Sequence, residues 1–226
     1  MKKLLPAVIG ICLILGCSKQ KQPKEKYSYD GIDVSHHQGN IDWETVAKDT
    51  SIQFVYIKAT EGATYVDSKY QYNISKANKT HLKVGSYHYF RMTSSPEEQF
   101  DNIKQNIKRD KQDLIPIIDV ETTDGKSAIS VKKNVLKLSI LMQNYYGKLP
   151  IIYGTQRSYN TILAPDFNNH LLYIGKYSKD PPSIKGKGKV AVWQFTEKGQ
   201  VDGINKSVDL CRIMQPFTLN DLLLKD

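Results

Sequence analysis

Residues 114–121 read Leu-Ile-Pro-Ile-Ile-Asp-Val-Glu, a short apolar run that closes on two carboxylates one residue apart. A run of this length is typical of a strand that is buried on both faces. Alternate strand residues point to the same side, so Asp119 and Glu121 would project together, about 7 Å apart along the backbone. Such a pair suits a reaction in which one carboxyl group must stay protonated while another group stabilises developing positive charge. The plainer interpretation is a strand end that runs into a polar loop.

Strand-like and helix-like segments alternate around this stretch, which predicts parallel strands joined by right-handed crossovers. We expect eight strands, at residues 31–35, 54–59, 84–90, 114–120, 149–153, 171–175, 190–195 and 207–210. Apolar spacing predicts helices around residues 43–47, 70–77, 96–107 and 131–145, and a short one around 158–163.

The last third of the chain lacks room for long helices. Pro181-Pro182 and Gly186-Lys187-Gly188 interrupt one late connection, and Gly199 and Gly203 interrupt the next. The expected fold class is therefore α/β, a TIM-like barrel with reduced helices in its last third. An open doubly wound sheet is the alternative, although residues 35–39 do not form the glycine-rich phosphate turn that it would require.

The first residues indicate export. Lys2 and Lys3 precede an apolar segment, residues 4–15, that is too short to span a membrane and fits a signal peptide. Residues 14–17, Ile-Leu-Gly-Cys, look like a bacterial lipoprotein cleavage box in which Cys17 is lipidated, with ordinary signal cleavage as the alternative.

These signals divide the chain into three parts. We expect a lipoprotein signal peptide at residues 1–16, the lipidated cysteine with a flexible tether at 17–28, and one catalytic barrel at 29–226. Cys12 would leave with the signal peptide and Cys17 would carry lipid. Cys211 then has no partner, so no internal disulfide is expected, and Cys211 is interpreted as a small buried residue.

Four acids fall where a barrel of this kind collects its reacting groups, at the carboxyl ends of strands. Asp33 lies on the first strand, Asp119 and Glu121 close the fourth, and Asp209 lies on the last. The first and last strands become neighbours when the barrel closes, so Asp33 and Asp209 would lie side by side. Crowded like charges raise at least one pKa, which keeps a carboxyl group protonated near neutral pH.

Aromatic and amide side chains are expected around the same mouth. Tyrosine is unusually frequent, with 14 residues, and flat aromatic rings beside hydrogen-bonding groups suit a carbohydrate. Tyr87, Tyr153, Trp193 and Gln194 are the candidates to bind it, whereas Tyr89 is expected in the core.

Other chemistries fit less well. Adjacent His36 and His37 would point in opposite directions, and a zinc site that joins one of them to His88 is a minor alternative. No phosphate loop and no Gly-x-Ser-x-Gly elbow occur, so neither a cofactor nor a metal is expected. The net charge of +9 is spread along the chain without a nucleic-acid-binding motif, which favours an anionic polymer such as cell wall or an anionic membrane.

Seven motifs follow one another from Asp30 to about Ile213: Gly31-Ile-Asp-Val-Ser35, Ile57-Lys-Ala-Thr-Glu-Gly62, Gly85-Ser-Tyr-His-Tyr-Phe90, Pro116-Ile-Ile-Asp-Val-Glu121, Pro150-Ile-Ile-Tyr153, Val192-Trp-Gln194 and Val208-Asp-Leu210. In this order they resemble glycoside hydrolase family 25, the lysozymes of the Chalaropsis type. These are N-acetylmuramidases that cleave the β-1,4 bond between N-acetylmuramic acid and N-acetylglucosamine in peptidoglycan. The resemblance implies a (β/α)5(β)3 barrel.

The resemblance also implies roles for individual residues. Glu121 would be the general acid, and Asp119 would orient the N-acetyl group of the substrate or stabilise charge at the anomeric carbon. Asp33 and Asp209 would be supporting acids, and the reaction would retain configuration. The residues expected to bind substrate are Tyr87, Tyr153, Trp193, Gln194, Glu61 and His88.

Two positions depart from the family pattern. Cys211 stands where Asn is frequent, and Tyr173 stands where Trp is common, which puts substrate subsites in question more than catalysis. The expected protein is an exported, lipid-anchored monomer whose partner is peptidoglycan. A non-catalytic wall-binding lipoprotein on the same scaffold and a glycosidase for chitin-like polymers are the alternatives.

Overall fold

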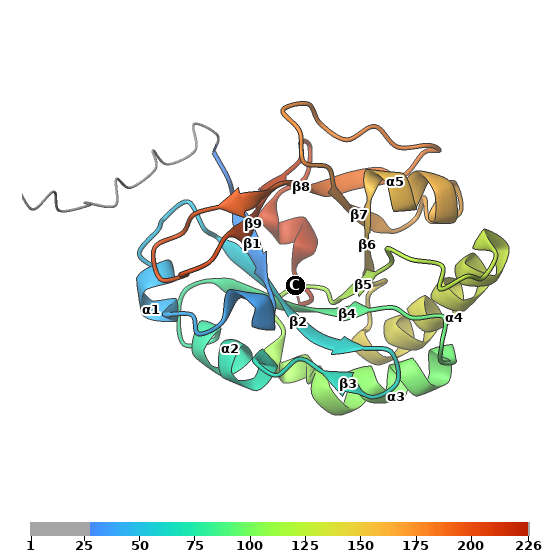
Figure 1. Ribbon diagram of the computed structural model, residues 1–226, viewed down its shortest axis with the longest axis horizontal. Helices are drawn as coiled ribbons and strands as arrows, with labels where there is room; N and C mark the ends of the chain where they lie inside the picture. Colours follow the sequence, from blue (N-terminus) through green and yellow to red (C-terminus); the bar gives the residue numbers. More distant parts are fainter. Residues whose placement is uncertain (1–27, 226) are drawn as a thin grey trace, which may run out of the picture.

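Eight strands close into a barrel in the computed structural model, which describes residues 28–225 (Figure 1). Hydrogen-bonded neighbours follow the order β1, β9, β8, β7, β6, β5, β4 and β2, and pairing of β1 with β2 closes the ring. The strands are β1 (Gly31–Val34), β2 (Phe54–Glu61), β4 (Lys83–Tyr89), β5 (Ile117–Asp119), β6 (Ile151–Thr155), β7 (Leu171–Gly175), β8 (Lys189–Gly199) and β9 (Val208–Ile213). A two-residue strand, β3 (Tyr65–Val66), extends β2 as a hairpin that the sequence did not predict. The TIM-like α/β barrel is confirmed.

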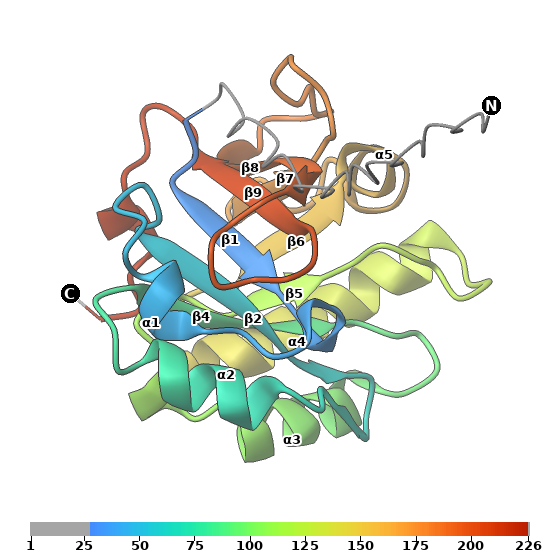
Figure 2. The ribbon, with the colours of Figure 1, turned by 60° about the vertical axis from the view of Figure 1, so that its left-hand side comes forward.

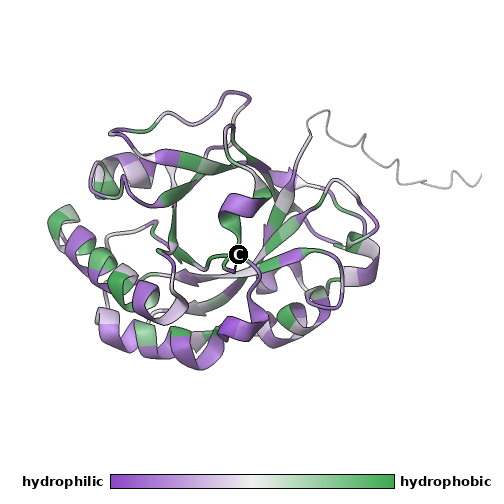
Figure 3. Cartoon of the chain, turned by 180° about the vertical axis from the view of Figure 1, so that it is seen from behind, coloured by the Kyte–Doolittle hydropathy of each residue, from purple (hydrophilic) through white to green (hydrophobic). Residues whose placement is uncertain are grey.

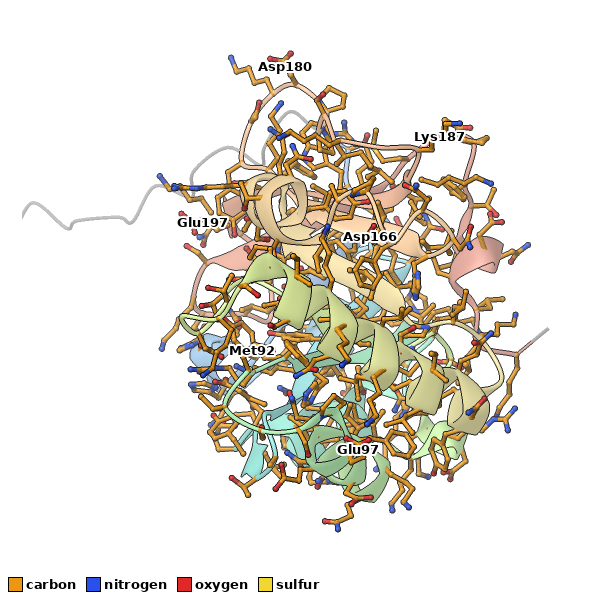
Figure 4. The ribbon with its side chains drawn as sticks, turned by 90° about the vertical axis from the view of Figure 1, so that its right-hand side faces the viewer. Met92, Glu97, Asp166, Asp180, Lys187 and Glu197 are labelled. Atoms are coloured by element: carbon orange, nitrogen blue, oxygen red, sulfur yellow. The ribbon has the colours of Figure 1, made fainter. Side chains whose placement is uncertain are left out.

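Helices cover the outside of the barrel between β1 and β7, and loops make the later connections (Figures 1 and 2). The helical elements are α1 (Trp43–Val46), α2 (Tyr70–Ala77), α3 (Pro96–Asn106), α4 (Ala128–Tyr146), α5 (Gln156–Ser158), the π-helical turn η3 (Tyr159–Leu163), and the 3-10 turns η1 (His36–Gln38), η2 (Arg109–Lys111) and η4 (Leu219–Leu222). Between β7 and β8 the chain crosses the outside over residues 176–188 without a helix, and Asp180 and Lys187 mark this crossing in Figure 4. Within residues 28–225, no helix is both long and apolar enough to cross a membrane.

Local sequence sets the ends of the two longest helices. The Ser95 hydroxyl accepts from the Glu98 amide at 3.2 Å, and the Glu98 carboxylate accepts from the Ser95 amide at 2.8 Å, so a capping box begins α3. Pro96 takes the first helical position. Helix α4 ends at Gly147, whose φ of 85° is left-handed and favours glycine.

The last strand runs against its neighbours. β9 is antiparallel to both β8 and β1, whereas the sequence placed Asp209 at the carboxyl end of the last strand. That placement is wrong, because Asp209 is the second residue of β9. Because β9 runs in the opposite direction, its first residues lie at the end of the barrel where the other strands finish. Asp209 therefore lies at the predicted mouth although it is near the start of its strand.

The central strand is shorter than predicted, because the residues before it bond to the C-terminal segment. Ladder pairing of β5 starts only at Ile117. The Ile115 amide donates to the Leu222 carbonyl at 2.9 Å, and Leu114 forms an isolated bridge with Leu223. In Figure 1 the C-terminal segment lies across the barrel axis. The chain end therefore covers the end of the barrel where β5 begins, opposite the mouth.

The core lies inside the barrel and between the strands and the helices. Figure 3 shows the strands mostly in hydrophobic colours and the helices alternating between hydrophobic and hydrophilic residues. The helical spacing predicted for α4 is confirmed, although Tyr146 is buried where the spacing favoured Tyr145, which is only partly buried. The buried residues of α4 are Val131, Val135, Leu138, Ser139, Met142 and Tyr146.

Leu222→Ala tests the contribution of the C-terminal segment. Leu222 is fully buried, so we expect the substitution to lower the free energy of unfolding by about 2–5 kcal/mol through lost apolar contact and a residual cavity. Leu136→Ala, on the exposed face of α4, is the matched control and should cost less than about 1 kcal/mol. Urea denaturation measures both variants. Equal midpoints for Leu222→Ala and wild type would show that the segment does not contribute to stability.

Candidate active site

Four acidic side chains line one cavity of about 120 Å³ at the mouth of the barrel. Asp33 comes from β1, Asp119 from the end of β5 and Asp209 from β9, while Glu121 follows β5 by two residues. Asp33 and Asp209 are directly opposed in the β1–β9 ladder. The prediction that barrel closure brings the four acids together is confirmed.

Tyrosines and one amide form most of the remaining wall. Three of the residues expected to bind substrate, Tyr87, Tyr153 and Gln194, line the cavity. Three further tyrosines, which the sequence did not assign to the substrate site, also line it: Tyr56, Tyr173 and Tyr177. Strand alternation would have found Tyr56 and Tyr173, but Tyr177 lies in an irregular loop after β7, where no periodicity indicates direction.

Hydrogen bonds fix the carboxylate of Asp33. Its Oδ2 accepts from the Tyr173 hydroxyl at 2.8 Å, from Gln194 Nε2 at 2.9 Å and from the Cys211 thiol at 3.3 Å. Gln194 Oε1 in turn accepts from the Tyr153 hydroxyl at 2.8 Å, which orients the amide. The two positions that depart from the family pattern, Tyr173 and Cys211, therefore contact the same carboxylate. Cys211 is free and fully buried, as predicted.

Asp33 and Asp209 share an environment that favours a proton. Burial raises the pKa of Asp209 to about 9, and the adjacent charge of Asp33 adds to this shift. Burial also raises the pKa of Asp33, against the opposing effect of the hydrogen bonds from Tyr173 and Gln194. The pair therefore holds one proton at neutral pH, with Asp209 as its favoured carrier and Asp33 as the acceptor.

Asp119 and Glu121 differ in exposure. Asp119 is buried, with 6% of its surface exposed, and burial together with the charge of Glu121 raises its pKa well above the usual range. Oδ1 of Asp119 has no hydrogen-bond partner among the described residues, which further disfavours its charged form. Glu121 is solvent-exposed, and its pKa is still raised, by desolvation on the side facing the protein and by the charge of Asp33. Solvent exposure makes the rise in the pKa of Glu121 smaller but does not turn it into a decrease.

Comparison with known proteins adds to this geometry. The family model described as "Glycosyl hydrolases family 25" matches residues 32–204. The chain belongs to glycosyl hydrolase family 25. It is similar to an autolytic lysozyme of Clostridium acetobutylicum, at 33% identity over 180 residues, which covers 80% of this chain and 54% of the relative. It is also similar to an uncharacterized protein, YegX, of Escherichia coli K12, at 37% identity over 187 residues, 81% of this chain and 68% of the relative.

Solved structures agree with this assignment. The structure of a family 25 glycosyl hydrolase from Bacillus anthracis matches with a TM-score of 0.78 at 29% identity, covering 90% of this chain and 97% of that one. The chain is therefore a glycoside hydrolase. The family resemblance of its seven motifs is confirmed.

An ion-pair chain beside the acids was not predicted. Lys58 Nζ lies 2.8 Å from Glu61 and 4.9 Å from the ring centroid of Tyr89, and Arg91 bonds Glu61 at 2.8 Å and Asp124 at 3.0 Å. The charge of Lys58 lowers the pKa of both Asp119 and Glu121 against the effect of burial. Lys58 is two residues after Tyr56 on β2, so strand alternation contained the signal that it faces the mouth.

The family 25 site leaves out three of the residues expected to bind substrate. Glu61 does not line the cavity and instead anchors Lys58 and Arg91. His88 is fully buried and bonds Thr60 at 2.8 Å and Gln99 at 3.1 Å, so its side chain turns away from the mouth, toward α3. Burial lowers the pKa of His88 to about 4.

Trp193 also lies outside the cavity. It precedes Gln194 on β8, and alternation places the two side chains on opposite faces, so Trp193 faces the outside of the barrel. The expectation of a core position for Tyr89 is wrong, because Tyr89 is half-buried and its ring lies under Lys58. Burial and the charge of Glu121 raise the pKa of Tyr89.

His36 and His88, two of the histidines considered for a zinc site, form hydrogen bonds with other side chains. His36 Nδ1 lies 2.7 Å from Asp67, whereas His88 bonds Thr60 and Gln99. Within residues 28–225, no group of three or more His, Cys, Asp or Glu side chains is arranged to hold a metal ion.

Asp209→Asn tests the shared proton. The folded pKa of Asp209 is raised from 3.8 to about 9, so wild type loses stability as pH rises between these two values, where the unfolded chain has already released the proton that the folded chain keeps. The amide stays neutral, so the variant should melt at least about 2–4 °C higher than wild type near neutral pH. The difference should vanish below about pH 3, where the acid is neutral in both the folded and the unfolded chain.

Circular dichroism melts across this pH range measure the effect. Asp101→Asn, an exposed acid on α3, is the control and should leave the difference from wild type independent of pH. A melting temperature for Asp209→Asn that parallels wild type at every pH would contradict a raised pKa at this position.

Proposed function

We propose that the protein is a muramidase that cleaves the β-1,4 bond between N-acetylmuramic acid and N-acetylglucosamine in peptidoglycan. One observation carries the proposal: four acids meet at one barrel mouth, and Glu121, whose pKa is raised, is the one among them that is solvent-exposed. An acid that holds its proton and is open to the cavity can give that proton to the leaving oxygen of a sugar. The name of the relative from Clostridium acetobutylicum, an autolytic lysozyme, supports the same substrate class.

In this proposal Glu121 is the general acid and Asp119 orients the N-acetyl group of the substrate. A raised pKa keeps Glu121 protonated at the pH where other glutamates are ionised. The partnerless oxygen of Asp119 leaves one hydrogen-bonding position that an amide N–H of the substrate would satisfy. The reaction would then retain configuration, with the N-acetyl group as internal nucleophile.

Asp33 and Asp209 act as supporting acids. The carboxylate of Asp33 is held by three hydrogen bonds, so it keeps its position while positive charge develops at the anomeric carbon. The proton on Asp209 reduces the repulsion that a second buried charge would cause. Tyr87, Tyr153 and Gln194 would contact the sugar rings from the cavity wall.

The cell envelope is the proposed location. Residues 1–27, with Cys17, lie outside the described residues, so the lipid anchor rests on the sequence pattern alone. We propose an exported lipoprotein monomer that acts on peptidoglycan while it is held at a membrane by acyl chains on Cys17. A net charge of +9 would draw such a protein toward an anionic wall.

Glu121→Gln tests the general acid. The amide keeps the shape of the side chain but has no acidic proton, so we expect the rate on purified cell wall to fall by at least about 10²-fold. Glu44→Gln, an exposed acid on α1, is the matched control and should keep the wild-type rate. Release of reducing ends measures the rate.

Three outcomes would change the assignment. Equal release by Glu121→Gln and wild type would remove Glu121 from its role. Wall pelleting by wild type without any release of reducing ends would favour the non-catalytic wall-binding protein. Release from chitin-like polymers but not from peptidoglycan would favour the other alternative.

Lys58→Met tests how the acids are tuned. The rate should follow a bell-shaped pH profile, because Glu121 must be protonated while another carboxylate stays ionised. Lys58 lowers the pKa of Glu121, so its removal should move the alkaline limb to higher pH. A flat profile would contradict the acid mechanism. An unmoved limb in Lys58→Met would show that this lysine does not tune the acids.

A further inference from the structure

A second groove opens on the outer face of β8 and β9, beside the catalytic cavity. It has a volume of about 370 Å³, and no helix covers this side of the barrel (Figures 1 and 2). Tyr177 lines both the groove and the cavity, and 53% of its surface is exposed. The two depressions therefore adjoin at Tyr177.

The floor of the groove is aromatic and ordered. Trp193 and Phe195 occupy alternate positions of β8 that face outward, and Arg212 of β9 is paired with Trp193 across the ladder. The Arg212 guanidinium carbon lies 5.7 Å from the Trp193 ring centroid and 5.1 Å from that of Phe195. Arg212 also donates two hydrogen bonds to the Ser28 carbonyl, at 3.1 and 2.6 Å. The guanidinium is thus held in place before any ligand arrives.

The rim of the groove carries positive charge. Lys179 and Lys198 line it, and neither forms an ion pair within 4.0 Å among the described residues, although Glu197 is nearby. Together with Arg212, these lysines outnumber the single acid, so the groove attracts an anion. The Trp193 indole donates to the Lys176 carbonyl at 2.8 Å, which fixes the start of the loop that carries Tyr177 and Lys179.

We infer that this groove binds the short acidic peptide that peptidoglycan carries on its muramic acid. The inference rests on the proposed function, because the muramic acid must occupy the cavity for its peptide to reach the groove. Carboxylates of the peptide would meet Lys179, Lys198 and Arg212 along the groove. An unbranched chitin-like polymer has no such substituent and would leave the groove empty.

The test compares two substrates with one pair of variants. The substrates are intact peptidoglycan and the same glycan strands after an amidase has removed the peptides. The double variant Lys179→Glu with Lys198→Glu reverses the charge of the rim in the full-length protein. Lys76→Glu with Lys79→Glu, on the exposed side of α2 and just after it, changes the net charge equally at a distance from the mouth and serves as the control.

We expect the rim variant to lose roughly fivefold or more of kcat/KM on intact peptidoglycan, since two charge contacts become repulsive. On peptide-free strands its rate should stay within about twofold of wild type, and the control variant should follow wild type on both substrates. The inference is overturned if the rim variant keeps its rate on intact peptidoglycan, or if it loses rate equally on both substrates. If wild type cleaves neither substrate, the proposed function itself is wrong.

Discussion

The antiparallel pairing of β9 with β1 sets Asp33 opposite Asp209, and the pairing of β1 with β2 closes the barrel around them. Two carboxyl groups in register, both largely removed from water, cannot both be charged at low cost. A proton shared by the two acids removes this repulsion. Hydrogen bonds from Tyr173, Gln194 and Cys211 hold the Asp33 carboxylate in place. The geometry of the other two acids follows, because the same closed ring brings β5 across the cavity from this pair.

The acids of the mouth differ in their access to water, and this difference separates their roles. Asp119 is buried and Asp33 is partly buried, whereas Glu121 is open to the cavity and to solvent. Lys58 is held beside the acids by Glu61 and lies over Tyr89, so its positive charge acts from a fixed position. Burial and the charge of Asp33 raise the pKa of Glu121, whereas the charge of Lys58 lowers it. The balance of these effects decides the pH range in which Glu121 holds a proton.

The loss of late helices has a consequence at the surface. In a barrel with all its helices, the outer faces of β8 and β9 would be covered. Here Trp193, Phe195 and Arg212 cover that face themselves, and the β7–β8 connection crosses it as an irregular loop. The uncovered strands leave a positively charged groove that shares Tyr177 with the catalytic cavity.

The sequence by itself determined the fold class, the capped helix α3, the end of α4 at Gly147 and the meeting of four acids at one mouth. These features depend on local spacing and on strand order, which the chain carries in its apolar pattern. Only the tertiary structure decided that β9 is antiparallel, that the C-terminal segment pairs with Leu114 and Ile115, and that His88 and Trp193 face away from the cavity. Those outcomes depend on hydrogen bonds and packing between residues far apart in the chain. A shift of one residue along a strand turns a side chain to the opposite face of the sheet, and the sequence motifs do not show which face it takes.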